Sequence, residues 1–256
     1  MAKKKKTITA GPIVKTIIYT APEPRDGPRV RAVKSKMTTA AQKAMNDKTA
    51  RGKLEMLLAA NFSNKDLFVT LTYRDKSLPS TRKEAVKLLR QFFKNLRKYR
   101  NARNLLTKYI YVTEELHGEK RLHHHIVLNA TGQDMELIRS LWPYGDVIHA
   151  GYIEGGSFAA LAEYLTKEGV QKRPVGAQMW TASRNMEKPL IETSYVGNDE
   201  TLTAPPGCHV LEREERVTEF GAYCYIKYYV PPTYWGKQTD GQPAQARGVQ
   251  PLLSCL

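Results

Sequence analysis

The chain has few cysteines, few acidic residues and no long apolar runs, and each of these shortages excludes a class of protein. Its three cysteines, Cys208, Cys224 and Cys255, form no Cys-x-x-Cys pair, so we expect no disulfide framework and a reducing, cytoplasmic environment. No apolar stretch approaches the ~18 residues that a membrane-spanning helix needs. The lysine run at residues 3–6 is not followed by an apolar segment of signal-peptide length. We therefore expect neither a membrane protein nor a secreted one.

Acidic residues are outnumbered by basic ones, 25 to 40, which gives the 256-residue chain a formal net charge of +15. Such a surplus attracts polyphosphate because binding releases condensed counterions, so nucleic acid is the expected partner. The chain contains no Gly-x-x-x-x-Gly-Lys-Ser/Thr phosphate loop, which excludes a helicase of the P-loop kind. Unwinding of a duplex would then have to come from another protein.

Apolar periodicity predicts an α+β fold. Strands are expected where β-branched and aromatic residues gather, and helices where apolar residues recur every third or fourth position. The expected strands are residues 67–73, 109–115, 122–129 and 146–153, with an edge strand at 13–19 and an aromatic strand at 222–230. The expected helices are residues 38–60, 81–99, 133–141 and 157–168. A short polar turn joins 109–115 to 122–129, which predicts an antiparallel hairpin.

The two ends of the chain differ in composition from its middle. The first 36 residues carry ten Lys or Arg against two acidic residues, which indicates a basic N-terminal arm. Residues 37–230 are expected to form one domain, whose aromatic strand at 222–230 either extends the sheet or contacts single-stranded DNA by stacking. Pro, Gly and Gln dominate residues 231–256, which predicts a mobile tail.

The run Arg121–Leu128, RLHHHIVL, places three histidines in an apolar strand. Successive side chains of a strand alternate between its faces, so His123 and His125 share one face, roughly 6.5 to 7 Å apart along the strand. His124 points to the opposite face with the apolar residues of the strand. Two imidazoles so placed can share a metal ion. The alternative is a set of hydrogen-bonded histidines without a metal.

A divalent metal held by two histidines also needs oxygen ligands, and the strand 109–115 ends in Glu114 and Glu115. If Ile110 and Val112 point to the apolar face of the sheet, Glu114 points there too and Glu115 points with the outer two histidines. We therefore predict Glu115 as the third ligand of Mg²⁺ or Mn²⁺. A bulge near the turn would exchange the two acids.

The helix at 157–168 carries Tyr164 at the edge of its apolar stripe, and Lys167 projects from the same side one turn later. Such a tyrosine can simply be an amphipathic core residue. A phenol can also attack a phosphodiester and remain covalently attached, although an ordinary tyrosine, with a pKa near ~10, needs help at neutral pH. A divalent cation gives that help by neutralising charge on the phosphate. Lys167 would then steady the phosphate, the metal's water or the phenolate.

Three segments stand in a fixed order: LFVTLTY at 67–73, RLHHHIVL at 121–128 and YLTK at 164–167. This ordered set resembles the motifs of rolling-circle replication initiators of the HUH endonuclease superfamily, of the kind found in small single-stranded-DNA phages and plasmids. The resemblance implies a five-stranded antiparallel sheet of the HUH/RRM-like type with flanking helices, and an endonuclease domain within residues 37–230. It also implies a metal-binding acid at the position of Glu115.

The resemblance further implies nicking of a single-stranded origin hairpin by Tyr164, which leaves a 5′-phosphotyrosine and a free 3′-hydroxyl. A DNA polymerase would extend that hydroxyl in the cytoplasm of a bacterial host cell, and a host helicase would unwind the duplex. Ala160 stands where initiators with two tyrosines have the second one, so a single-tyrosine mechanism is expected, with strand closure by a second subunit or another nucleophile. The alternatives are a transposase or relaxase of the same chemistry, or a non-catalytic DNA-binding protein on the same fold.

Overall fold

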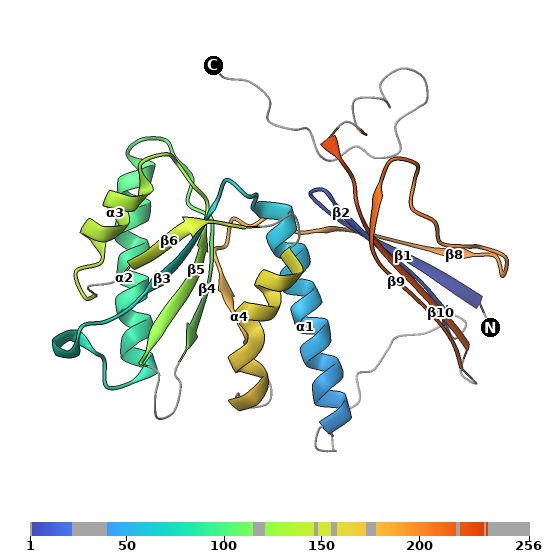
Figure 1. The fold of residues 1–256 in the computed structure, drawn as a ribbon, viewed down its shortest axis with the longest axis horizontal. Helices are drawn as coiled ribbons and strands as arrows, with labels where there is room; N and C mark the ends of the chain where they lie inside the picture. The colour runs from blue at the N-terminus through green and yellow to red at the C-terminus, as the bar shows by residue number, and fades with distance from the viewer. Residues whose placement is uncertain are drawn as a thin grey trace, which may run out of the picture. The chain divides into compact units, whose positions relative to one another are not determined.

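The computed structural model describes residues 2–21, 40–114, 121–145, 148–154, 158–172, 178–218, 221–232 and 234. The chain divides into unit 1, residues 1–37 and 188–256, and unit 2, residues 38–187. Each unit contains a five-stranded antiparallel sheet, and four α-helices are present in the described residues (Figure 1). The predicted α+β class is confirmed. None of the described helices has the length and apolar character needed to cross a membrane.

The sheet of unit 2 is the five-stranded antiparallel sheet that the motifs predicted. Its strands lie in the order β6, β3, β5, β4, β7, and every neighbouring pair is antiparallel. The strands are β3 (Leu67–Leu71), β4 (Tyr109–Glu114), β5 (His123–Leu128), β6 (Ile148–Tyr152) and β7 (Thr181–Ala182). The edge strand β7 was not predicted, because two residues are too short to show a period.

The helices of unit 2 cover both faces of this sheet. They are α1 (Ala40–Asn61), α2 (Arg82–Asn101), α3 (Asp134–Leu141) and α4 (Phe158–Lys172), with a 3₁₀ turn, η1, at Asp75–Ser77. In Figure 1, α2 and α3 lie on one side of the sheet and α1 and α4 on the other. Each α-helix overlaps a predicted one. The N-cap of α2 is Thr81, whose hydroxyl accepts a hydrogen bond from the backbone N–H of Glu84, because the first N–H groups of a helix have no partner within it.

The main hydrophobic core lies between α2 and the sheet. The apolar stripe of α2, which includes Leu89, Phe93 and Leu96, is buried there. The ring of Phe93 stacks on that of Tyr109 in β4 with 3.6 Å between the ring centroids. Since neighbours along a strand alternate in direction, the tyrosines of β4 face α2 and the residues between them face α4.

The second helical layer of unit 2 holds α4 in place. Helices α1 and α4 pack together, and Leu54 and Leu58 of α1 and Leu165 of α4 are almost fully buried. Arg51 of α1 also lies 3.2 Å from a carboxylate oxygen of Glu163 in α4. The position of α4 decides where any side chain on its sheet-facing side lies.

The sheet of unit 1 has the strand order β8, β1, β2, β10, β9. These strands are β1 (Ala2–Ala10), β2 (Ile13–Ala21), β8 (Leu190–Val196), β9 (His209–Thr218) and β10 (Gly221–Tyr229). A small buried cluster of Ile18, Leu202 and Ile226 packs on one face of the sheet. Strands from the two ends of the sequence therefore build this unit together.

Two expectations for the chain ends differ from the structure. Residues 2–21, expected as part of a basic arm, form the β1–β2 hairpin, because β1 pairs on one side with β2 and on the other with β8, and Lys5 forms an ion pair with Glu200. The expected strand 222–230 is β10, but it lies between β2 and β9 and does not extend the sheet of unit 2. Residues 22–36 of the expected arm, and 233 and 235–256 of the expected tail, lie outside the described residues.

Candidate metal centre

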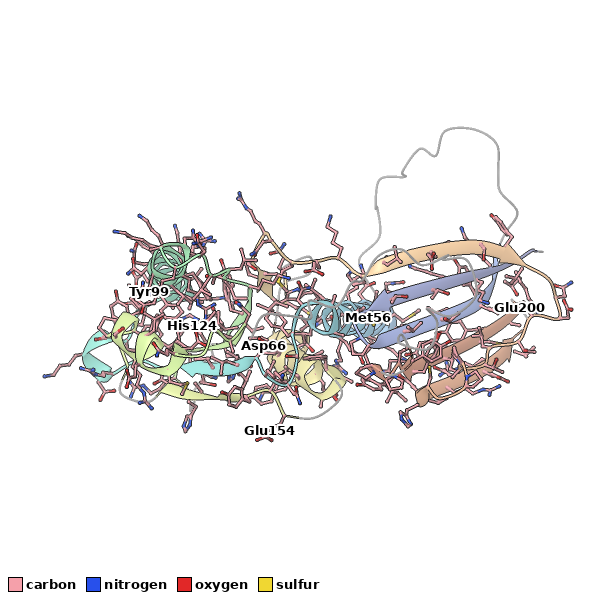
Figure 2. All side chains as sticks on the ribbon, turned by 90° about the horizontal axis from the view of Figure 1, so that it is seen from above. Met56, Asp66, Tyr99, His124, Glu154 and Glu200 are labelled. Carbon is pink, nitrogen blue, oxygen red and sulfur yellow. The ribbon has the colours of Figure 1, made fainter. Side chains whose placement is uncertain are left out.

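The three histidines of β5 point alternately to opposite faces of the unit 2 sheet. His124 faces α2 and is 0% exposed, and Figure 2 labels it in the interior of the unit. Its Nε2 lies 2.7 Å from the hydroxyl of Tyr73, and its Nδ1 lies 2.9 Å from the hydroxyl of Thr113. Burial lowers the pKa of His124 to about 3, since a buried imidazole resists charging. His124 is thus a neutral, hydrogen-bonded core residue.

His123 and His125 share the opposite face, and their Nε2 atoms lie 3.1 Å apart. The Nδ1 of His123 is 2.8 Å from the carbonyl oxygen of Arg121. A carbonyl oxygen only accepts, so this Nδ1 carries the proton, and in the neutral imidazole the Nε2 keeps its lone pair. The Nδ1 of His125 is 3.0 Å from the hydroxyl of Thr70, which can accept in the same way. Both imidazoles are therefore oriented as metal-bound histidines usually are, with Nδ1 held by an outer partner.

A buried carboxylate completes this group. Glu114 is 1% exposed, and its Oε2 lies 3.5 Å from the Nε2 of His123 and 3.7 Å from that of His125. Burial raises the pKa of Glu114, but hydrogen bonds from the two imidazoles, and their positive charge when they are protonated, outweigh it and lower the pKa to about 2. Its Oε1 is also buried and has no hydrogen-bond partner among the described residues. The carboxylate is thus charged and only partly satisfied.

The acid in this place is Glu114, where the sequence had favoured Glu115. The preference for Glu115 assumed that Ile110 and Val112 face the apolar side with Ile126, and this assumption is wrong. In the pairing of β4 with β5, Val112 lies opposite His125 and Glu114 opposite His123, and directly opposed residues share a face. The core-facing residues of β4 are its tyrosines. Glu115 itself lies outside the described residues.

The residues present fit a single divalent cation. One ligand atom from each of Glu114, His123 and His125 lies within 4.8 Å of the others, which suits three ligands that each bind one ion at about 2.0–2.2 Å. Two nitrogen lone pairs and a carboxylate oxygen that converge in a buried place repel one another unless positive charge lies among them. The Oε1 of Glu114, which has no hydrogen-bond partner among the described residues, offers a further ligand atom for the cation. We call these three residues the Glu-His-His triad.

The predicted nucleophile lies beside this triad. The hydroxyl of Tyr164, on α4, is 3.3 Å from the Nε2 of His125. Its ring meets those of His125 and Phe68 edge-on, with centroids 5.0 Å and 5.8 Å away. The residue is still 39% exposed. An exposed tyrosine whose hydroxyl reaches a buried polar group is accessible to a large substrate and yet fixed in position.

Lys167 also lies in this group, and its Nζ is 3.6 Å from the centre of the Tyr164 ring. An ammonium over an aromatic ring is attracted by the ring quadrupole, so Lys167 and Tyr164 are held together beside the triad. Of the predicted site residues, His123, His125, Tyr164 and Lys167 are therefore brought together on one face of the sheet.

Sequence reasoning gave no site role to Phe68 or Thr70 of β3. Thr70 contacts the Nδ1 of His125, and the ring of Phe68 stacks on that imidazole with 5.5 Å between centroids. The alternation of buried and half-buried residues along β3 places both side chains away from the core. That alternation was a usable signal, since an aromatic and a hydroxyl on the outer face of a central strand need a reason to be there.

The comparisons with known proteins agree with this geometry. Residues 66–169 match a family model described as Replication-associated protein, of the ORF2 type. The comparisons with curated proteins and with solved structures give no match. The matched range begins just before β3 and ends within α4, so it holds the triad, Tyr164 and Lys167. The resemblance to Rep-type replication initiators is confirmed for this range, and the match supports a role in initiating replication.

Proposed function

Because residues 66–169 are related to this family of replication-associated proteins, we propose that this chain is a metal-dependent endonuclease that starts rolling-circle replication. It nicks a single-stranded origin hairpin by attack of Tyr164 on a phosphodiester. The observation that carries this proposal is the 3.3 Å separation between the Tyr164 hydroxyl and the Nε2 of His125 in the Glu-His-His triad.

The reaction exchanges one phosphate ester for another. The phenolic oxygen of Tyr164 forms a bond to phosphorus and gives up its proton, while the bond from phosphorus to the 3′-oxygen breaks and that oxygen takes up a proton. The products are a 5′-phosphotyrosine and a 3′-hydroxyl end. Because the ester energy is kept in the new bond, the cleaved strand can be rejoined later without a further energy source.

The residues around the Tyr164 hydroxyl have different roles in the proposed reaction. Glu114, His123 and His125 would hold the cation, while Thr70 and the Arg121 carbonyl fix the orientation of the imidazoles. A divalent cation bound there supplies positive charge to the scissile phosphate. The ammonium of Lys167, above the Tyr164 ring, stabilises negative charge on the phenol oxygen or on the phosphate.

The donor set of two imidazoles and one carboxylate favours Mn²⁺ over Mg²⁺ in this site. Mg²⁺ prefers an all-oxygen shell, whereas affinity for nitrogen ligands rises along the first-row transition metals. Both ions are hard enough to bind a phosphate oxygen. We expect Mn²⁺ to bind the isolated protein more tightly, and Mg²⁺ to support nicking only at higher concentration.

The proposed reaction depends on other macromolecules. Ala160, one turn before Tyr164, offers no second phenol, so closure of the circle needs a second subunit or another nucleophile. A host helicase would open the duplex and a DNA polymerase would extend the 3′-hydroxyl.

The direct test is formation of a covalent protein–DNA adduct. The purified chain is mixed with a labelled single-stranded origin hairpin and Mn²⁺, and we expect a labelled species that survives boiling in detergent. The Tyr164→Phe variant should lose the adduct and keep DNA binding. Tyr99→Phe is a matched control, since Tyr99 is 38% exposed and also carries a cation, Arg103, 3.6 Å from its ring centre.

The outcomes separate the candidate functions. An adduct with Tyr164→Phe would show that another residue is the nucleophile. Binding without any adduct, across metals and substrates, would favour a non-catalytic DNA-binding protein on this fold. An adduct formed only on the ends of a mobile element or on a transfer origin would favour a transposase or relaxase of the same chemistry.

A further inference from the structure

A groove of about 750 Å³ lies in unit 2 between α2, the start of β4 and the segment that follows β7. Its floor includes Tyr109 and Tyr111, which face α2. The triad lies on the opposite face of the sheet, because Glu114 has the other parity along the same strand. The groove is therefore separate from the candidate metal centre.

Three arginines line this groove, Arg90 and Arg97 from α2 and Arg184 from the segment after β7, and none of the described lining residues is a carboxylate. Within the described part of the chain, none of the three forms an ion pair. All three act on the same group: burial raises the pKa of Tyr109, and Arg97, Arg90 and Arg184 oppose that rise. Three guanidinium groups that all act on one hydroxyl, with no counter-charge among the residues that the structure describes, form a site of strongly positive potential.

A buried hydroxyl in the same groove lacks a partner. Thr107 lines the groove and is 5% exposed, and its Oγ1 forms no hydrogen bond to any described residue. A buried donor without an acceptor is costly and rare in folded proteins. An anion bound in the groove would accept this hydrogen bond and balance the arginines at the same time.

The groove is built by specific contacts. The backbone N–H of Ser183 donates to the carbonyl of Tyr109, and the Ser183 hydroxyl accepts from the Tyr109 N–H. The side chain of Asn185 donates to the Thr107 carbonyl at 3.2 Å. These bonds fix Arg184, which lies between the two residues, against the start of β4.

The spacing of the arginines indicates a ligand with several phosphates. Arg90 and Arg97 are seven residues apart on one helix, which places them roughly 10 Å apart along its axis at about 1.5 Å per residue. That length covers about three steps of one strand of a B-form duplex, measured along the duplex axis at about 3.4 Å per step.

We propose that this groove binds consecutive backbone phosphates of the substrate DNA, at a distance from the phosphate that is cleaved. The inference deepens the proposed function, because the DNA is the same substrate. It assigns the α2 face of the sheet to holding the DNA and the α4 face to cutting it. Arginine suits this role since its planar guanidinium binds two phosphate oxygens at once.

The test measures DNA binding, so its result does not depend on whether nicking occurs. Affinity for a labelled hairpin is measured across a range of salt for the Arg90→Ala/Arg97→Ala/Arg184→Ala variant. Loss of three phosphate contacts should lower the slope of log affinity against log salt by about 2, at about 0.7 per contact for a single strand. The matched control is Lys65→Ala/Lys87→Ala/Lys98→Ala, which removes three exposed charges outside the groove and should retain most of the slope.

Further measurements make each outcome decisive. Equal slopes for the two triple variants would overturn the proposal, provided that thermal melting shows both to be folded. If the arginine variant melts early, Arg184→Ala alone, at an exposed position, should still lower the slope by about 0.7. Thr107→Val should weaken DNA binding without lowering thermal stability, and stronger or unchanged DNA binding would contradict the role of the hydroxyl.

A final experiment distinguishes binding of DNA from binding of a free nucleotide, which has the same phosphate chemistry. Binding of dATP and of inorganic phosphate to the wild type and the arginine variant is measured in the same buffer. We expect weak binding of both, with no dependence on the three arginines comparable to that of DNA. Tight, arginine-dependent binding of dATP, together with an unchanged DNA slope, would make the groove a nucleotide site and overturn the proposal.

Discussion

Glu114 lies directly opposite His123 in the pairing of β4 with β5, and its Oε2 is 3.5 Å from the Nε2 of His123. This pairing puts the only acid of β4 on the face that carries His123 and His125. A carboxylate with a pKa lowered to about 2 stays charged at every pH at which the protein would work. The charge of the triad is therefore set by the register of two strands.

Glu114→Gln should weaken Mn²⁺ binding far more than Glu115→Gln. The substitution keeps the size of the side chain but removes the negative charge, and loss of even an outer partner of a metal site typically costs about 10–100-fold in affinity. Isothermal titration with Mn²⁺ measures the effect. A larger loss for Glu115→Gln than for Glu114→Gln would contradict the assignment of the third ligand.

The sequence predicts those features of this site that depend on neighbouring residues. It does not predict those that depend on contacts with distant parts of the chain. His123 and His125 share a face because side chains alternate along any strand, and no other part of the chain is needed to know it. The choice between Glu114 and Glu115 depends on which face of β4 meets the core. Local composition favoured its Ile and Val, but Tyr109 stacks on Phe93 and takes that face.

The sheet of unit 1 shows this limit of sequence-based prediction more strongly. Four consecutive lysines, Lys3 to Lys6, have no local tendency to form a strand. They do so in β1 because Ile17 and Ile18 of β2 pair on one side and Thr193 and Ser194 of β8 on the other. Pairing across some 190 residues leaves no local pattern in the sequence, and that is why this region was expected as an arm.

Thr70→Val should lower Mn²⁺ affinity about 10–100-fold while the protein stays folded. Valine has the shape of threonine but cannot hold the Nδ1 of His125, which now lies 3.0 Å from the hydroxyl. The ring is then free to turn, and its Nε2 points at the ion for less of the time. Calorimetry with Mn²⁺ measures the change. Thr193→Val, on the exposed strand β8, is the control, and equal affinities for the two variants would argue against this role of Thr70.

Because of His124, the protein should become less stable as the pH is lowered through the mildly acidic range. In the folded chain its pKa is lowered from 6.5 to about 3, mainly by burial. Between these two values only the unfolded chain binds the proton, so stability falls as the pH drops below 6.5. The loss is at most about 1.4 kcal/mol per pH unit.

Urea unfolding between about pH 7 and about pH 5, with a chelator present to remove metal, measures this dependence; the window lies above the range where carboxylates titrate. The His124→Gln variant has no imidazole to protonate in the unfolded chain. The slope of its unfolding free energy against pH should therefore be smaller than that of the wild type, by the amount that corresponds to about one proton. Parallel curves would show that this imidazole binds protons equally in the folded and unfolded chains, so that burial does not lower its pKa.

Asp134→Asn should destabilise unit 2 more than an ordinary surface change. Asp134 is 4% exposed and its Oδ1 lies 2.6 Å from the guanidinium of Arg100, which is 0% exposed. Burial raises the pKa of Asp134, but hydrogen bonds from Thr131 and Arg100 outweigh it and lower the pKa. The variant leaves the buried Arg100 without its counter-charge, which typically costs about 3–5 kcal/mol.

The comparison that isolates this pair uses Glu136→Gln, an exposed acid on the same helix, α3, which should change stability by less than about 0.5 kcal/mol. Urea midpoints give both values. The double variant Asp134→Asn/Arg100→Met should recover part of the loss, because an apolar side chain replaces the uncompensated charge. Equal midpoints for Asp134→Asn and Glu136→Gln would mean that the buried ion pair contributes nothing to stability.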